Sequence, residues 1–190
     1  MADAVASQGA YMQQRIALLS LALVVGAAGL AMAQQDKSKR PSPPASADCK
    51  FADGKTIHVD YSSPRAKGRK IFGGVVPYGK PWRTGANEAT SFKTDTDLVA
   101  NKVNVPAGSY TIFSLPTENG WKLIINKQTG QWGTVYDEKQ DLARIDMKKQ
   151  SLPSPAENFT IAFDQVAPDT CRMRLEWETT RGSLDFKEEK

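Results

Sequence analysis

The chain has 190 residues, a formal net charge of +4, one histidine and two cysteines. One histidine and two cysteines are too few side chains for the usual zinc sites, and we expect neither a metal nor a cofactor. After residue 33, no apolar run is long enough to span a bilayer.

The N-terminal segment has the order of a secretory signal peptide. Arg15 is followed by the apolar run 16–30 and by the small-residue triplet Ala31-Met32-Ala33 before Gln34. This order predicts a signal peptide over residues 1–33, with cleavage between Ala33 and Gln34. The alternative is an uncleaved membrane anchor, for which the apolar run is short. We therefore expect an exported protein, periplasmic or secreted, with no nucleic-acid partner and no membrane contact after cleavage.

One tether and one domain are expected after cleavage. Residues 34–48 are polar and rich in Pro and Ser, which is typical of a flexible tether. Residues 49–190 are enough for a single domain with its own core. Both cysteines, Cys49 and Cys171, lie in this domain. An oxidising compartment favours a disulfide between them over two separately buried thiols.

The domain has the sequence pattern of an all-β fold. In residues 56–62, Ile57, Val59 and Tyr61 alternate with more polar residues, and residues 172–177 alternate in the same way. Turn residues separate such runs, most clearly Asn119-Gly120. The pattern predicts a single antiparallel β-sandwich, jelly-roll-like or related, with at most one short helix near residues 137–146.

Positive charge is concentrated in residues 62–88, which hold six basic residues and one acidic residue, a net charge of +5. If residues 64–69 are extended, Arg65, Lys67 and Arg69 point to the same side. Such a row is suited to an anionic ligand. It is equally typical of a solvated edge strand that charge protects from aggregation.

The stretch 77–88 follows, and its side chains are unusual for a plain loop. It offers the aromatic rings of Tyr78 and Trp82, the guanidinium of Arg83, the amide of Asn87 and the carboxylate of Glu88. Rings with convergent polar groups are typical of a sugar site. The arginines suit a small anionic ligand instead, with Arg83 acting beside Arg65 or Arg69. The alternative is a purely structural role for this stretch, in which Arg83 and Glu88 form an ion pair and Trp82 covers one end of the fold.

Three further side chains are weaker candidates. His58, the only histidine, lies on the polar face of a predicted strand, where a lone histidine is usually just exposed. Trp132 is expected at an edge and is a secondary site candidate, whereas Trp121 is expected in the core. Glu88 could join another acid as the carboxylate pair of a glycoside hydrolase.

The block "PYG–WRTGANEA", with "PAGSYTIFSLP", "QWG" and "LEWETT", resembles a bacterial family known as domain of unknown function 2911. The resemblance covers about residues 55–180. It implies an exported, all-β bacterial protein and no particular reaction, cofactor or ligand. The residues of this chain that match the family's hallmark positions are Arg65, Gly68, Arg69, Pro77, Tyr78, Gly79, Trp82, Arg83, Thr84, Gly85, Asn87 and Glu88.

Three functional hypotheses remain open. The first is a binding module for a glycan or a small anionic ligand at the Tyr78–Glu88 region. The second is a structural or interaction protein of the cell envelope, in which this region is architecture. The third is a carbohydrate-active hydrolase or lyase that uses Glu88, with Arg83 as the electrophilic partner. The sequence does not determine the oligomeric state.

Overall fold

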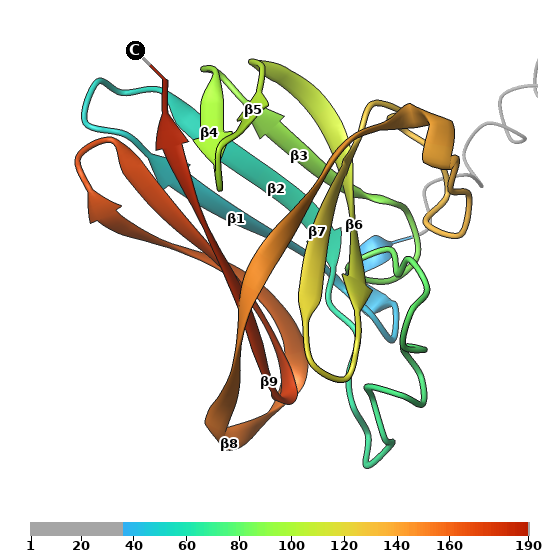
Figure 1. The fold of residues 1–190 in the computed structure, drawn as a ribbon. Coiled ribbons are helices and arrows are strands. Elements are labelled where there is room, and N and C mark those ends of the chain that lie inside the picture. Colours follow the sequence, from blue (N-terminus) through green and yellow to red (C-terminus); the bar gives the residue numbers. More distant parts are fainter. Residues whose placement is uncertain (1–35, 190) are drawn as a thin grey trace, which may run out of the picture. The chain divides into compact units, whose positions relative to one another are not determined.

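The computed structural model of the protein describes residues 36–189, and Figure 1 shows their arrangement. The predicted signal peptide, residues 1–33, lies outside this range. The described residues form two single-turn 3-10 helices, η1 (Lys37–Lys39) and η2 (Glu138–Gln140), and nine strands: β1 (Pro44–Lys50), β2 (Thr56–Ser62), β3 (Thr90–Thr94), β4 (Leu98–Ala100), β5 (Val103–Val105), β6 (Gly108–Pro116), β7 (Trp121–Asn126), β8 (Asp141–Ala167) and β9 (Thr170–Glu188).

All strand pairs are antiparallel, and they join into one nine-stranded sheet in the order β1-β2-β3-β6-β7-β8-β9-β4-β5. The prediction of an all-β fold is thus confirmed. The predicted turn at Asn119-Gly120 joins β6 to β7, where the Thr117 N–H donates to the Gly120 carbonyl at 2.8 Å. The predicted short helix is reduced to η2, because β8 begins at Asp141.

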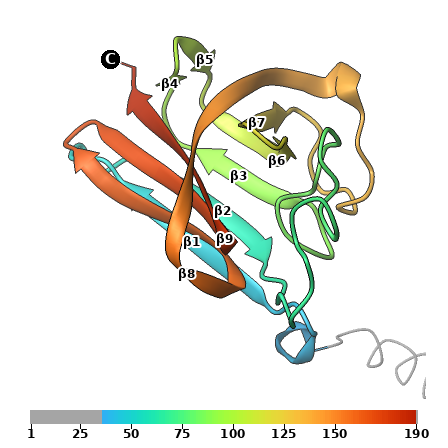
Figure 2. The same ribbon diagram turned by 60° about the horizontal axis from the view of Figure 1, so that its bottom comes forward.

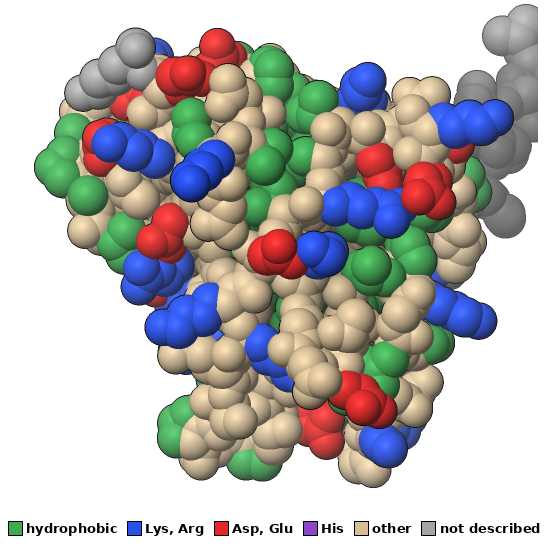
Figure 3. All heavy atoms as spheres, viewed as in Figure 1, with side chains coloured by type: hydrophobic (Ala, Val, Ile, Leu, Met, Phe, Trp, Pro, Cys, Tyr) green, Lys and Arg blue, Asp and Glu red, His purple; other side chains and the backbone are tan. Residues whose placement is uncertain are grey.

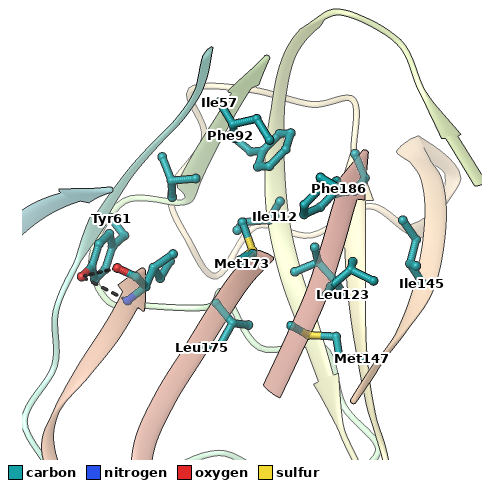
Figure 4. Close-up of a cluster of buried hydrophobic side chains, with 14 of the residues drawn as sticks. Ile57, Tyr61, Phe92, Ile112, Leu123, Ile145, Met147, Met173, Leu175 and Phe186 are labelled. Carbon is teal, nitrogen blue, oxygen red and sulfur yellow. Dashed lines mark hydrogen bonds between the residues drawn. The ribbon is translucent and has the colours of Figure 1, made fainter. Parts of the chain in front are cut away.

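The long strand β8 bends the sheet back over itself. Its first residues, 141–147, pair with β7, and residues from Lys148 onward pair with β9. As a result β9 faces β2, β3 and β6 across the core, as Figures 1 and 4 show. The rings of Phe92 on β3 and Phe186 on β9, for example, have centroids 5.3 Å apart.

The core consists of the apolar residues that the two-residue period predicted. Ile57, Val59 and Tyr61 of β2 are buried, and so are Met173 and Leu175 of β9. Period two places alternate side chains on one face of a strand, and here that face is the inner one. Where β2 meets β8, the Tyr61 hydroxyl accepts a hydrogen bond from the N–H of Ile161 at 3.2 Å.

The predicted disulfide is confirmed, whereas the predicted tether extends too far. Cys49 on β1 is bonded to Cys171 on β9, and both residues are buried. Residues 44–48, predicted as tether, belong to β1 and pair with β2. The compact unit that contains the sheet begins at Ser38. Within residues 36–189, no helix is long and apolar enough to cross a membrane.

Candidate functional site

The basic stretch and the aromatic stretch lie in one long loop, residues 63–89, between β2 and β3 (Figures 1 and 2). Trp82 fastens the loop to β6, because its N–H and carbonyl both bond to Ser114, at 2.7 and 2.8 Å. Residues 64–69 are not extended, so the condition under which Arg65, Lys67 and Arg69 would point to the same side is not met. The Arg69 N–H bonds to the Ala66 carbonyl at 3.1 Å, and the turn between them contains Lys67 and Gly68, both with positive φ.

The structure describes six non-glycine residues with positive φ, and three of them, Lys67, Thr84 and Asn87, lie in this loop. Thr84 is the most unusual, because a β-branched residue rarely adopts a φ of +52°. Its hydroxyl donates to the Ser114 hydroxyl at 3.1 Å, and its carbonyl accepts from the Thr90 hydroxyl at 2.9 Å. Such backbone strain is found most often at functional sites, so it directs attention to the cavity beside this turn.

A cavity of about 440 Å³ lies beside Thr84, and three of the predicted site residues line it: Arg69, Trp82 and Arg83. Its volume falls within the usual range for small-molecule sites. None of the described residues that line it is acidic. The complete lining is Ser42, Pro64, Arg69, Val75, Pro81, Trp82, Arg83, Gly85, Ala86, Phe113, Gly133, Thr134, Tyr136 and Trp177.

The half-buried guanidinium of Arg83 is the main charged group of this cavity. Its only hydrogen bond among the described residues is a long one, from Nε to the Gly85 carbonyl at 3.4 Å, and no carboxylate there pairs with it. Burial lowers the pKa of Arg83, which means that the surroundings disfavour its charge. Gly133 covers the stem of this side chain, since a Cβ at position 133 would lie 2.5 Å from Arg83 Cδ.

Within residues 36–189, the arginines outside the loop form ion pairs with carboxylates. Basic and acidic side chains are interspersed over the face shown in Figure 3. The ion pairs of these arginines are Arg40–Glu88, Arg144–Asp141, Arg172–Asp185, Arg174–Asp164 and Arg181–Glu176. By contrast, the loop arginines Arg65, Arg69 and Arg83 donate their hydrogen bonds within residues 36–189 to carbonyl or hydroxyl oxygens. The three loop arginines therefore differ from the others in having no carboxylate partner within residues 36–189.

Aromatic rings form one wall of the cavity. The indoles of Trp82 and Trp177 are stacked, with centroids 5.6 Å apart and an interplanar angle of 19°. Phe113 meets the ring of Tyr136 edge-on at 4.8 Å. Burial and the hydrogen bond to Asp141 raise the pKa of Tyr136 to about 12, so its hydroxyl stays protonated and fixed.

The structure separates Glu88 from Arg83. The carboxylate of Glu88 is bound by Nη1 of Arg40, at 2.9 and 3.0 Å, and it lines a different cavity, together with His58. Asn87 donates to the carbonyl of Ser42 at 3.1 Å. Glu88 and Arg83 therefore do not face one site, as the hydrolase or lyase hypothesis with Arg83 as the electrophilic partner would require.

The remaining predicted residues lie outside the cavity lining. Tyr78 is 37% exposed and Trp132 is 50% exposed. Arg65 bonds to the carbonyl and hydroxyl of Ser63, and Lys67 occupies the turn described above. Of the eight ligand-binding residues predicted, only Arg69, Trp82 and Arg83 thus share one cavity.

Sequence reasoning missed several lining residues. Trp177 alternates with polar residues along β9, a pattern that indicates a core residue and gives no sign of a cavity. Ser42 lies in the stretch predicted as tether. Thr134 and Tyr136 follow Trp132-Gly133, and the only sequence signal there is a glycine beside an exposed tryptophan.

His58 lies between two carboxylates on the outer face of β1 and β2. Nδ1 contacts Asp48 and Nε2 lies 3.1 Å from Asp60, so neither ring nitrogen is left to act as a base. The hydrogen bond to Asp48 is the largest influence on the ring and raises the pKa of His58 above its usual value of 6.5. No group of three or more potential metal ligands occurs within residues 36–189.

This raised pKa predicts a small pH dependence of stability. The charged ring is favoured in the folded state, so its contribution is complete below about pH 6.5 and is lost as the pH rises through the raised value. The ring is 38% exposed, which limits the effect to less than about 1 kcal/mol. Urea unfolding between pH 5 and 9 should show this decline in the parent and a flatter profile in His58→Gln. A parent profile as flat as that of the variant would contradict the prediction.

Comparison with known proteins identifies a family without an assigned function. No curated protein and no solved structure matches the chain significantly. The model of one protein family matches residues 42–186, which include β1, the loop 63–89 and most of β9. The chain therefore belongs to the family described as "Protein of unknown function (DUF2911)".

Proposed function

We propose that this protein is an exported binding module that holds a small anionic ligand in the cavity beside Thr84, with Arg83 as the principal contact. One observation carries the proposal. Arg83 is half-buried, and no carboxylate within residues 36–189 pairs with it. Burying an uncompensated charge is unfavourable, so an anion in the cavity would supply the missing partner.

The geometry of a guanidinium suits this role. Among the described residues Arg83 makes one hydrogen bond, through Nε, and its two terminal nitrogens remain to donate in parallel to a carboxylate, phosphate or sulfate. Arg69 lines the same cavity and adds a second positive charge. The basic residues of the loop would also raise the local concentration of anions and so speed their entry.

A neutral glycan fits the lining less well than an anion does. Sugar hydroxyls need hydrogen-bond acceptors as well as donors, and sugar sites usually provide them as carboxylates or side-chain amides. The described lining contains neither group. The two residues predicted for that purpose, Asn87 and Glu88, are engaged by Ser42 and Arg40.

An architectural role explains part of the loop. Trp82 packs on Trp177 and Phe159, and the contacts of Asn87 and Glu88 fasten the N-terminal residues 40–43 to the loop. These contacts build the cavity wall and do not involve the charge of Arg83. We therefore assign Trp82, Asn87 and Glu88 to the framework of the site and Arg83 to the ligand.

The test is the variant Arg83→Met, which keeps the length of the side chain and removes its charge. Stability should stay the same or rise, because burial disfavours the parent charge. Binding of inorganic phosphate, sulfate and benzoate, followed by tryptophan fluorescence, should weaken roughly 10–100-fold, as expected for a charge-assisted hydrogen bond.

Arg174→Met is the matched control. Arg174 forms ion pairs with Asp164 and Glu176 at 2.7 Å each, so removing it takes this partner from the partly exposed Asp164, whereas Glu176 keeps its ion pair with Arg181. This variant should lose about 1–2 kcal/mol of stability and keep its anion binding. If Arg83→Met lost as much stability as the control, or if no anion bound to the parent protein, the proposed function would be wrong.

A further inference from the structure

We infer that the ligand is an amphiphilic anion, with one oxyanion group on an apolar body such as an aromatic ring or a short alkyl chain. This inference rests on the proposed function and names the class of molecule that the same cavity would take. It depends on the side chains that line the cavity away from Arg83, most of which are of apolar types.

The cavity is larger than a bare oxyanion requires. A volume of about 440 Å³ is more than tenfold the roughly 30 Å³ that one water occupies in the liquid. An inorganic anion bound to Arg83 would leave the remaining space filled with water against apolar walls. An apolar group attached to the anion would displace that water, which is favourable in proportion to the area covered.

Two aromatic residues of the lining, Trp177 and Tyr136, have their polar atoms occupied elsewhere. Nε1 of Trp177 donates to the Glu157 carbonyl at 3.2 Å. The Tyr136 hydroxyl donates to Asp141 at 2.6 Å and accepts from Arg144 at 2.8 Å. Tyr136 therefore offers the cavity the apolar surface of its ring, whereas Trp177 is only 1% exposed and lies stacked on Trp82. Val75 and Pro81 add exposed apolar surface, and Pro64, Ala86 and Phe113 line the cavity but are themselves buried.

Few acceptors remain for a polyhydroxylated body. The carbonyl of Gly85 already accepts from Arg83, and the carbonyl of Ser42 accepts from Asn87. Ser42 and Thr134 contribute the only aliphatic hydroxyl groups among the described lining residues. A sugar acid would satisfy Arg83, but most of its hydroxyls would be removed from water without replacement partners, which is unfavourable.

The experiment compares probes that share a head group and differ in the body. Dissociation constants for the parent protein would be measured by tryptophan fluorescence for acetate, benzoate, octanoate and glucuronate, and for inorganic phosphate against phenyl phosphate. We expect benzoate or octanoate to bind at least tenfold more tightly than acetate, or phenyl phosphate to exceed phosphate by the same factor. Glucuronate should bind no better than acetate.

A substitution in the apolar wall tests how much the apolar body of the ligand adds to the affinity, independently of the head group. Val75 lines the cavity and is 42% exposed, so Val75→Ser should leave the fold intact. It should weaken benzoate several-fold while the affinity for acetate stays unchanged. Val166→Ser is the control, because Val166 is 44% exposed and lies on β8 outside the lining.

The outcomes distinguish this inference from the proposed function. If none of the anions binds, the proposed function fails and the inference fails with it. If the anions bind and Arg83→Met abolishes their binding, but the apolar body adds no affinity, the proposed function stands and the inference is overturned. A preference for glucuronate over benzoate also overturns it.

Discussion

Removal of the Cys49–Cys171 disulfide is expected to lower the free energy of unfolding by about 4–5 kcal/mol. The two cysteines are 122 residues apart in the sequence, and in the chain-entropy model a loop of this length gives a stabilisation of that size. The bond also joins β1 to β9, which are not neighbours in the hydrogen-bonded sheet. Without it, β1 is held mainly by its pairing with β2 and by packing.

The measurement is guanidinium unfolding of the parent, of Cys49→Ala, and of the double variant Cys49→Ala with Cys171→Ala. Both variants should lose similar stability, because either one removes the cross-link, and the midpoint of thermal unfolding should fall by roughly 10 °C or more. Adding a reductant to the parent should reproduce the loss. A loss below about 1 kcal/mol in all three cases would show that the cross-link does not restrict the denatured chain.

The strands that could be predicted are those with one buried face. Residues 56–62 and 172–177 alternate because their inner side chains pack in a core and their outer ones meet solvent. That pattern depends only on local sequence and on the pleat of a strand. It therefore predicted the all-β class and the residues that fill the core.

The strands that were missed lack this pattern for identifiable reasons. β1 is an edge strand whose inner residues, Ala45 and Ala47, are too small to give a strong apolar signal. Only the earlier part of β8 was missed, since residues 158–164 alternate: that part contains Pro153 and Pro155, which usually mark a loop, and its register with β9 shifts between Ser151 and Ala156. Tertiary pairing overrides the local preference in both strands.

The candidate site could be predicted only in part. Arg69, Trp82 and Arg83 were singled out by residue type, and they do share a cavity. The prediction grouped them with Glu88 because it assumed that side chains close in sequence point into the same site. The strained turn at Thr84–Asn87 directs Arg83 and Glu88 to different cavities, and periodicity has no means of predicting such a turn.

The cavity also depends on contacts between distant parts of the sequence. Its walls come from residue 42, from β6, from residues 133–136 and from β9. No local pattern relates these segments to one another. The sequence could therefore identify an unusual loop, whereas the absence of an acid beside Arg83 could be seen only in the folded chain.

Trp82 provides the second large effect that the structure predicts. Its indole is stacked on Trp177 and meets Phe159 edge-on at 4.9 Å, while its backbone pairs with Ser114. Trp82→Ala removes both ring contacts and leaves a space beside the core. We expect a loss of about 3 kcal/mol in the free energy of unfolding, at the lower end of the range for buried aromatic residues because Trp82 is only partly buried.

Trp132→Ala is the matched control for this variant. Trp132 is 50% exposed and makes none of the ring contacts found for Trp82, so its replacement should change stability by no more than about 0.5 kcal/mol. Both variants would be compared by urea unfolding. A Trp82→Ala protein as stable as the control would contradict a framework role, and Trp82 would then have to be assigned to the ligand. The expected loss would instead mean that the loop is held in place by its tryptophan, so that Arg83 can be kept in the cavity without a carboxylate partner.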